Sequence, residues 1–207
     1  MIDSNLLKPE EYLKKAYLNK ERWVSYAIQI MLVKKMITQG KILEIGVGNS
    51  LVADFLRKIY YLQTVDINPD LKPDFIASVD DLDSLADNQF DLVSCFEVLE
   101  HLNFERFVKS LKELNRVSSR YVLLSLPYWG YTFGFKMKLP IFGEHVLKFK
   151  ISGFKKHQFN GQHYWEIGKR GYTLKLIKDL IKAEGLKICE SFWDLDDPYH
   201  YYFVLEK

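Results

Sequence analysis

The chain has 207 residues, of which 48% are apolar and 27% charged, and its formal net charge is only +2. This length suits one domain with a substantial core. A charge this close to zero gives no global field that would favour nucleic acid or a membrane surface, so any basic patch has to be local. No apolar run is long enough to cross a bilayer, and the first residues lack the core of a signal peptide. We therefore expect a cytoplasmic protein without integral membrane association.

The first forty residues predict two helices. Pro9 suits a first helical position, and Asn19 is a suitable N-cap for a second helix that ends near Gly40. The apolar positions of this second helix indicate a broad buried face. They are Trp23, Ala27, Ile30, Met31, Val33 and Ile37. We expect residues 1–40 to form N-terminal helices that pack on a core domain spanning residues 41–207, and two roles stay open for them: covering a bound ligand or forming a dimer.

From residue 41 onwards, strand and helix patterns alternate. Short apolar runs predict strands at 42–45, 62–65, 74–79, 90–96, 121–126, 186–192 and 199–205. Helical spacing predicts helices at 51–59, 104–114 and 174–181. Strands separated by helices form parallel βαβ units, whereas the last two strands, joined only by a turn-rich linker, pair antiparallel. The pattern predicts an α/β, Rossmann-like, doubly wound and mostly parallel seven-stranded sheet with an antiparallel terminal strand.

Residues 128–163 interrupt this alternation. They combine aromatic residues and glycines with the lysines Lys136, Lys138, Lys148, Lys150, Lys155 and Lys156. We interpret them as an insertion with irregular or short helical structure. Three roles stay open for it. It could be a lid over an anionic substrate, an amphipathic segment at a membrane interface, or a solvated basic face over an aromatic core.

A glycine loop follows the first predicted strand of the core. Gly46 and Gly48 allow a ligand to approach the backbone without an intervening Cβ, and the next helix begins with exposed N–H groups. Asp66 ends the following strand, where its carboxylate can accept hydrogen bonds from both ribose hydroxyls of an adenosine-type ligand. Leu51 stands where dinucleotide-binding loops have their third glycine, so the loop favours a ligand without a pyrophosphate.

Three segments together resemble the class I S-adenosylmethionine-dependent methyltransferases. They are residues 42–48, 65–69 and 88–102, with the sequences ILEIGVG, VDINP and NQFDLVSCFEVLEHL. The last one, with FDLV followed by EVLEH, is typical of the family's fourth strand and the loop after it. The resemblance implies an enzyme that uses S-adenosylmethionine as methyl donor and releases S-adenosylhomocysteine.

The resemblance also implies roles at the methionine end of the cofactor. Glu44, Gly46 and Gly48 would shape this part of the pocket, with the Glu44 carboxylate near the amino group or its water shell. Phe96, together with the following Glu97, would form the floor beside the sulfonium.

At the adenosine end, the resemblance implies that Asp66 holds the ribose diol and that Ile67 packs on the adenine. Val79 through its backbone and Asp80 through its carboxylate would reach the adenine edge, with Asp81 as the alternative carboxylate. Ser78 occupies a place where relatives often carry an acid.

The methyl acceptor is the least determined part of the prediction. His101 follows the fourth strand near the expected mouth of the cofactor site, where it would suit a general base or would cap the next helix. The segment from His163 to Glu166 either borders the acceptor pocket or forms a packed aromatic corner. Neither Cys95 nor Cys189 belongs to a Cys-x-x-Cys pair, and we expect no metal site.

We expect a small-molecule or glycan/lipid-type acceptor, with an anionic acceptor as one option. The low net charge argues against RNA without excluding nucleic acid. The alternatives are an RNA methyltransferase, a non-catalytic S-adenosylmethionine-binding module and, opposed by Leu51, a nicotinamide oxidoreductase. The sequence leaves the oligomeric state open.

Overall fold

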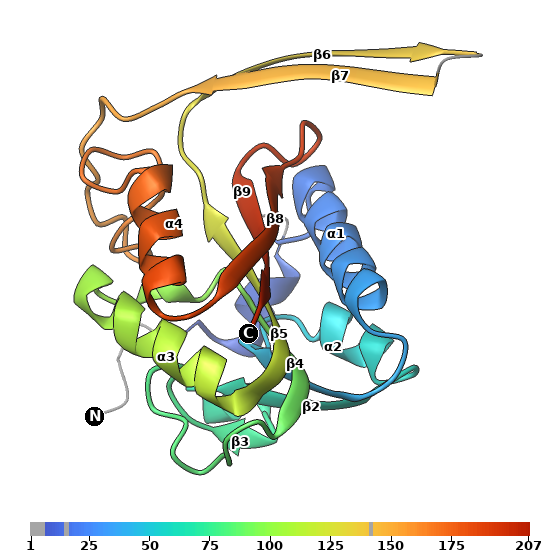
Figure 1. Cartoon of the computed structure of the whole chain (residues 1–207), viewed down its shortest axis with the longest axis vertical. Helices are drawn as coiled ribbons and strands as arrows, with labels where there is room; N and C mark the ends of the chain where they lie inside the picture. The colour runs from blue at the N-terminus through green and yellow to red at the C-terminus, as the bar shows by residue number, and fades with distance from the viewer. Residues whose placement is uncertain (1–6, 15–16, 141–142) are drawn as a thin grey trace.

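The computed structural model describes residues 7–14, 17–140 and 143–207. Within them, seven strands form one sheet in the order β3-β2-β1-β4-β5-β9-β8 (Figure 1). Their bounds are β1 Lys41–Ile45, β2 Tyr61–Asp66, β3 Phe75–Ile76, β4 Phe90–Phe96, β5 Ser118–Pro127, β8 Lys187–Trp193 and β9 His200–Glu206. The α-helices are α1 Lys20–Met36, α2 Leu51–Leu56, α3 Phe107–Val117 and α4 Leu174–Ala183. Short 3-10 turns lie at Pro9–Leu13, Pro69–Leu71, Leu99–His101 and Phe104–Arg106.

The strand directions confirm the predicted fold class. Strand β1 pairs parallel with β2 and β4, β2 pairs parallel with β3, and β4 pairs parallel with β5. Strand β9 is antiparallel to both of its neighbours, β5 and β8. The antiparallel strand is therefore the last one in the sequence, yet it lies inside the sheet and β8 forms the edge. The third strand is shorter than the predicted 74–79.

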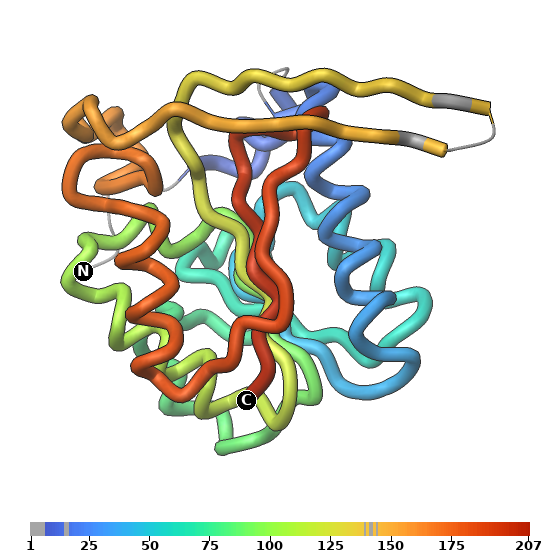
Figure 2. Tube along the Cα trace, turned by 45° about the horizontal axis from the view of Figure 1, so that its top comes forward, coloured from blue at the N-terminus to red at the C-terminus, as the bar shows by residue number. Residues whose placement is uncertain are grey.

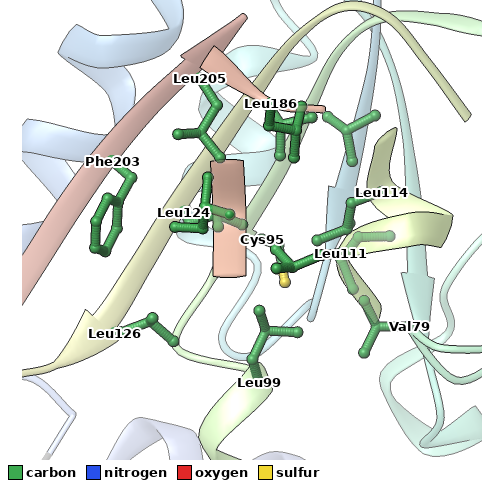
Figure 3. Packing of buried hydrophobic residues seen from close by; sticks show 14 of the residues in the cluster. Val79, Cys95, Leu99, Leu111, Leu114, Leu124, Leu126, Leu186, Phe203 and Leu205 are labelled. Carbon is green, nitrogen blue, oxygen red and sulfur yellow. The ribbon is translucent and has the colours of Figure 1, made fainter. Parts of the chain in front are cut away.

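Helices cover both faces of the sheet, as a doubly wound fold requires (Figure 1). On one face, α3 and α4 bury Leu111, Leu114 and Ile177 against β4 and β5. On the other face, α1 and α2 pack through Val33 and Leu56. Figure 3 shows the first of these clusters, in which side chains of α3 gather around Cys95 of β4. Among the described helices, none combines the length and apolar character that a membrane crossing requires.

Helix α1 begins as predicted but buries a partly different face. The side chain of Asn19 accepts a hydrogen bond from the backbone N–H of Arg22, which confirms its capping role. The predicted buried face is right for Val33 and Ile37 but wrong for Trp23 and Met31, which are exposed. The helix also buries Ser25 and Gln29 with Leu32 and Val33, because Ser25 meets the hydroxyl of Tyr202 in β9 and Gln29 donates to Ser25.

The predicted irregular or short helical structure of the insertion holds for residues 152–163, which are irregular, but is wrong for the part before them. Strands β6 (Tyr131–Leu139) and β7 (Gly143–Ile151) pair antiparallel and form a separate two-stranded sheet. Figure 2 shows this hairpin as two long arms that cross one end of the molecule and extend beyond it. The physical reason is a period of two: aromatic and apolar residues alternate with small and basic ones along both arms, which is the pattern of a strand with two unlike faces.

The two faces of the hairpin differ sharply. Directly opposed residues point to the same side of an antiparallel pair. Tyr131, Phe133, Phe135 and Met137 therefore share the outer face with Leu147, Phe149 and Ile151. All seven are exposed, with exposed fractions between 41% and 71%.

The inner face is fastened to the body of the protein. Lys136 pairs with Asp196 at 2.9 Å, and Lys148 donates to the carbonyl of Trp193. Lys150 donates to the carbonyls of Tyr128 and Pro198, and its burial lowers the pKa of its ammonium to about 8.

Candidate active site

One cavity of about 260 Å³ lies at the carboxyl ends of β1, β2 and β4. Ligands of open α/β sheets bind at this edge, because the loops that leave the strands converge there. The described cavity lining includes every predicted site residue except Asp80: Glu44, Gly46, Gly48, Asp66, Ile67, Val79, Phe96 and His101. The structure thus brings together residues that are spread over nearly sixty positions of the sequence.

The glycine loop is held by the strand next to it. Gly46 has a φ of +88°, and a Cβ at this position would lie 2.5 Å from Cγ2 of Val98. Asp66 fixes the loop from the other side, since its Oδ2 accepts a 2.8 Å hydrogen bond from the backbone N–H of Val47. Its Oδ1 accepts another, also 2.8 Å, from the N–H of Asn68. Asp66 therefore shapes the loop in addition to facing the cavity.

Glu44 places a buried carboxyl group at the cavity. Its Oε2 atom has no hydrogen-bond partner among the described residues. Burial raises the pKa of Glu44 to about 8, because a charged carboxylate is poorly solvated there. Such a group can bind a hydrogen-bond donor or a cation, and the ammonium group of a ligand is both.

The adenosine side contains one residue that the structure places elsewhere. Ile67 is 41% exposed and, like the buried Val79, lines the cavity. The carboxylate of Asp80 instead receives hydrogen bonds from Arg106 at 2.6 and 2.5 Å and one from the hydroxyl of Ser78 at 2.6 Å. Asp80 thus holds Arg106, whereas Ser78 lines the cavity itself.

The cavity floor rests on a buried network of polar side chains. Phe96 is followed by Glu97, whose φ is +55°. Burial alone would raise the pKa of Glu97, but the His200 imidazole 3.2 Å away and the Ser125 hydroxyl lower it to about 2. His200 is also buried, which favours its neutral form, yet Glu97 and Asp197 raise its pKa to about 9.

The same network of polar side chains continues from Asp197 to the N-terminal helix. Tyr202 donates to Asp197 at 2.5 Å, and the hydroxyls of Tyr202 and Ser25 lie 2.9 Å apart. Gln29 donates to Ser25 at 3.1 Å. Helix α1 and strand β9 are thereby connected to the floor of the cavity.

Two histidines and a glutamate form one wall. Nδ1 of His101 lies 3.1 Å from the carbonyl oxygen of Gln162, which can only accept, so Nδ1 carries the proton and Nε2 the lone pair. Burial and the nearby His163 lower the pKa of His101 to about 4, which keeps the ring neutral. Glu100 is fully buried, and burial together with the Glu97 charge raises its pKa well above the usual range.

Several cavity residues were missed by the sequence analysis. The N-terminal segment covers the cavity with Tyr12, Tyr17 and Arg22, although nothing in its local pattern indicates contact with a glycine loop. Glu100 was visible in the EVLEH motif but had no assigned role. His163 and Tyr164 line the cavity, whereas the neighbouring Trp165 is fully buried, so the segment serves as both pocket border and aromatic corner.

Comparison with known proteins finds a likeness to a methyltransferase domain in part of the chain. Residues 43–122 match the model of the methyltransferase domain family. No curated protein matches the chain in sequence.

Solved methyltransferases share the fold. A S-adenosylmethionine-dependent methyltransferase from Archaeoglobus fulgidus is 16% identical with a TM-score of 0.60, covering 94% of this chain and 100% of its own. The magnesium protoporphyrin IX methyltransferase of Synechocystis PCC 6803, solved with bound S-adenosylmethionine, is 13% identical with a TM-score of 0.59. The match covers 90% of this chain and 80% of that protein's chain. The glycopeptide N-methyltransferase MtfA, complexed with S-adenosylhomocysteine, is 11% identical with a TM-score of 0.57, covering 87% and 88%.

The matched segment contains the glycine loop, Asp66 and the EVLEH motif, and the fold extends the likeness over most of the sequence. Residues 43–122 are thus similar to a methyltransferase domain, and the chain has the fold of solved S-adenosylmethionine-dependent methyltransferases.

Proposed function

We propose that this protein transfers the methyl group of S-adenosylmethionine to a small molecule or to a glycan- or lipid-type acceptor. The observation that carries the proposal is that one cavity joins the glycine loop and Asp66 to the wall formed by His101 and His163. The cofactor supplies an electrophilic methyl group on a sulfonium, so the protein has mainly to align a nucleophile and exclude water.

The cavity residues fit this cofactor. Asp66 would accept hydrogen bonds from the ribose hydroxyls, because its oxygens retain lone pairs beside those used by Val47 and Asn68. The unpartnered carboxylate oxygen of Glu44 would receive the ammonium group of the methionine part. Ile67 offers an exposed apolar surface for the adenine, and Phe96 borders the floor.

On the acceptor side, His101 would accept a proton at Nε2 from an oxygen or carbon acceptor, whereas a neutral amine needs no base. Three of the insertion's six lysines, Lys136, Lys148 and Lys150, contact the body of the protein itself. Their engagement favours a small acceptor over a long polyanion such as RNA.

A lipid-type acceptor has one specific observation in its favour, the exposed apolar outer face of the β6–β7 hairpin. A contiguous apolar surface of this kind is uncommon on a protein that meets only water. The full chain should co-sediment with phospholipid vesicles, and a Phe135→Ser/Leu147→Ser double variant should remain in the supernatant. Ile76→Ser, which changes an equally exposed residue at the β3 edge, is the matched control. Equal sedimentation of the double variant would remove this argument for a lipid-type acceptor.

The first test of the function is calorimetry of the purified chain with S-adenosylhomocysteine, with NAD as comparator. We expect micromolar binding of the first and none of the second. Binding of NAD alone would contradict the proposed chemistry. If neither ligand binds, the protein is not a self-sufficient methyltransferase.

A further inference from the structure

A three-residue cluster in the wall of the cavity has the composition of a metal site. One carboxylate oxygen of Glu100 and one ring nitrogen from each of His101 and His163 all lie within 4.8 Å of one another. Glu100 and His101 come from the turn after β4, and His163 comes from the loop after the hairpin. All three line the cavity that also contains the glycine loop.

Glu100 itself points to a missing ligand. Its side chain is completely buried, yet among the described residues no donor side chain reaches its carboxylate oxygens, and the carboxylate of Glu97 beside it is itself an acceptor. Leaving a buried carboxyl group unpaired costs free energy, and most such groups are paired with a partner or with a metal ion. The nearest cationic candidate, Nε2 of His163, is 3.9 Å away, which is beyond hydrogen-bonding distance.

Both histidines are oriented as metal ligands usually are. The Nδ1–H of His101 is directed to the carbonyl oxygen of Gln162 at 3.1 Å. Nδ1 of His163 lies 3.2 Å from the carboxylate of Glu166, which itself accepts a hydrogen bond from Tyr199 at 3.1 Å. An acceptor on one ring nitrogen fixes the tautomer and leaves the lone pair on the other, and this arrangement is the common support of ligating histidines.

We propose that Glu100, His101 and His163 bind one divalent transition-metal ion. Two imidazoles and one carboxylate suit Zn²⁺, Mn²⁺, Co²⁺ or Fe²⁺ better than Mg²⁺ or Ca²⁺, which prefer oxygen ligands. Three ligand atoms that surround one such ion at about 2.0–2.2 Å lie roughly 3–3.8 Å from one another, so a cluster whose atoms lie within 4.8 Å has to close by up to roughly 1–2 Å. Three protein ligands leave open positions that face the cavity.

The use of this ion, though not its binding, rests on the proposed methyl transfer. An acceptor hydroxyl in an open position would be held beside the cofactor, and the ion would lower its pKa. The hydroxyl proton goes to water, the oxygen forms a bond to the methyl carbon, and the carbon–sulfur bond breaks with its electron pair left on sulfur. In this arrangement the ion replaces His101 as the group that activates the acceptor.

The test is titration of the full chain, purified without a histidine tag and stripped with a chelator, with MnCl₂ followed by calorimetry and electron paramagnetic resonance. We expect one equivalent of Mn²⁺ to bind. Glu100→Gln and His163→Gln should each weaken binding at least about tenfold, because the loss of even a supporting partner has an effect of this size. His145→Gln, which alters an exposed histidine on the hairpin, should bind Mn²⁺ like the unmodified chain.

Binding of S-adenosylhomocysteine by the same samples separates the possible results. Variants that retain this binding are folded, so a loss of Mn²⁺ binding in them supports the site. An unmodified chain that binds S-adenosylhomocysteine but no Mn²⁺ overturns the metal site and leaves the methyltransferase function intact. Undiminished Mn²⁺ binding by both Glu100→Gln and His163→Gln also overturns it. An unmodified chain that binds Mn²⁺ but no S-adenosylhomocysteine contradicts the proposed function alone.

Discussion

Replacing Asp66 with alanine should weaken both the fold and the cofactor site, by separable amounts. The backbone N–H groups of Val47 and Asn68 each lose an acceptor at 2.8 Å. A hydrogen bond to a charged group contributes about 1.5–3 kcal/mol, and cavity water would replace part of it, so the loss of stability is about 2–4 kcal/mol. Two lost ribose contacts at about 1.5 kcal/mol each correspond to roughly 100-fold weaker binding of S-adenosylhomocysteine.

Urea denaturation measures the first quantity and calorimetry the second. The urea midpoint should fall by about 1 M, given a typical slope of about 1–3 kcal/mol per molar. Asp66→Asn keeps one acceptor oxygen and should lose about half as much stability, with an intermediate affinity. A folded Asp66→Ala variant with normal affinity would refute the ribose role. An unchanged urea midpoint would show that the two backbone contacts do not stabilise the loop.

Two further substitutions test the environment of the site. In the folded protein the pKa of Glu44 is raised from an ordinary value of 4.5 to about 8. The contribution of this group to the stability of the ligand-free protein is therefore fully present below pH 4.5. It is lost as the pH rises to about 8. Glu44→Gln should therefore be more stable than the unmodified chain above pH 8, by on the order of 1 kcal/mol or more; parallel pH dependence of the two melting temperatures would contradict the raised pKa. Ser50 has a φ of +62° and caps no helix through its side chain. A left-handed conformation costs a residue with a Cβ roughly 1–2 kcal/mol, and glycine entropy offsets about 0.5–1, so Ser50→Gly should gain about 0.5–1 kcal/mol in urea denaturation. A clear loss would show that the serine side chain stabilises the loop.

The parts of the site that depend on local pattern were predictable. Gly46 and Gly48 follow strand β1 and Asp66 ends the parallel strand β2, and the carboxyl ends of such strands meet at one edge of the sheet. Sequence spacing alone was therefore enough to place them together. The strand and helix periods likewise predicted the layers on both faces of the sheet.

The parts that depend on distant partners were not predictable. Asp80 stands at a suitable strand end, but Arg106 binds it from the start of the α3 segment. His163 meets Glu100 and His101 only because the chain returns past the hairpin to the same wall. The hairpin strands were detectable from the alternation of Phe133, Phe135 and Met137, but the lysines between them indicated a basic surface. Their partners on the body belong to residues near the end of β8 and after it.

The network of polar side chains beneath Glu97 has a consequence for synthesis of the protein. The glycine loop and Glu97 leave the ribosome early, whereas Asp197, His200 and Tyr202 emerge long after them. Until these residues arrive, the Glu97 carboxylate has no imidazole beside it, and helix α1 has no hydroxyl to bond through Ser25. We therefore expect cofactor capture to be a late event on the nascent chain, since a translation product stalled before strand β9 would contain the glycine loop and Asp66 without a finished cavity floor.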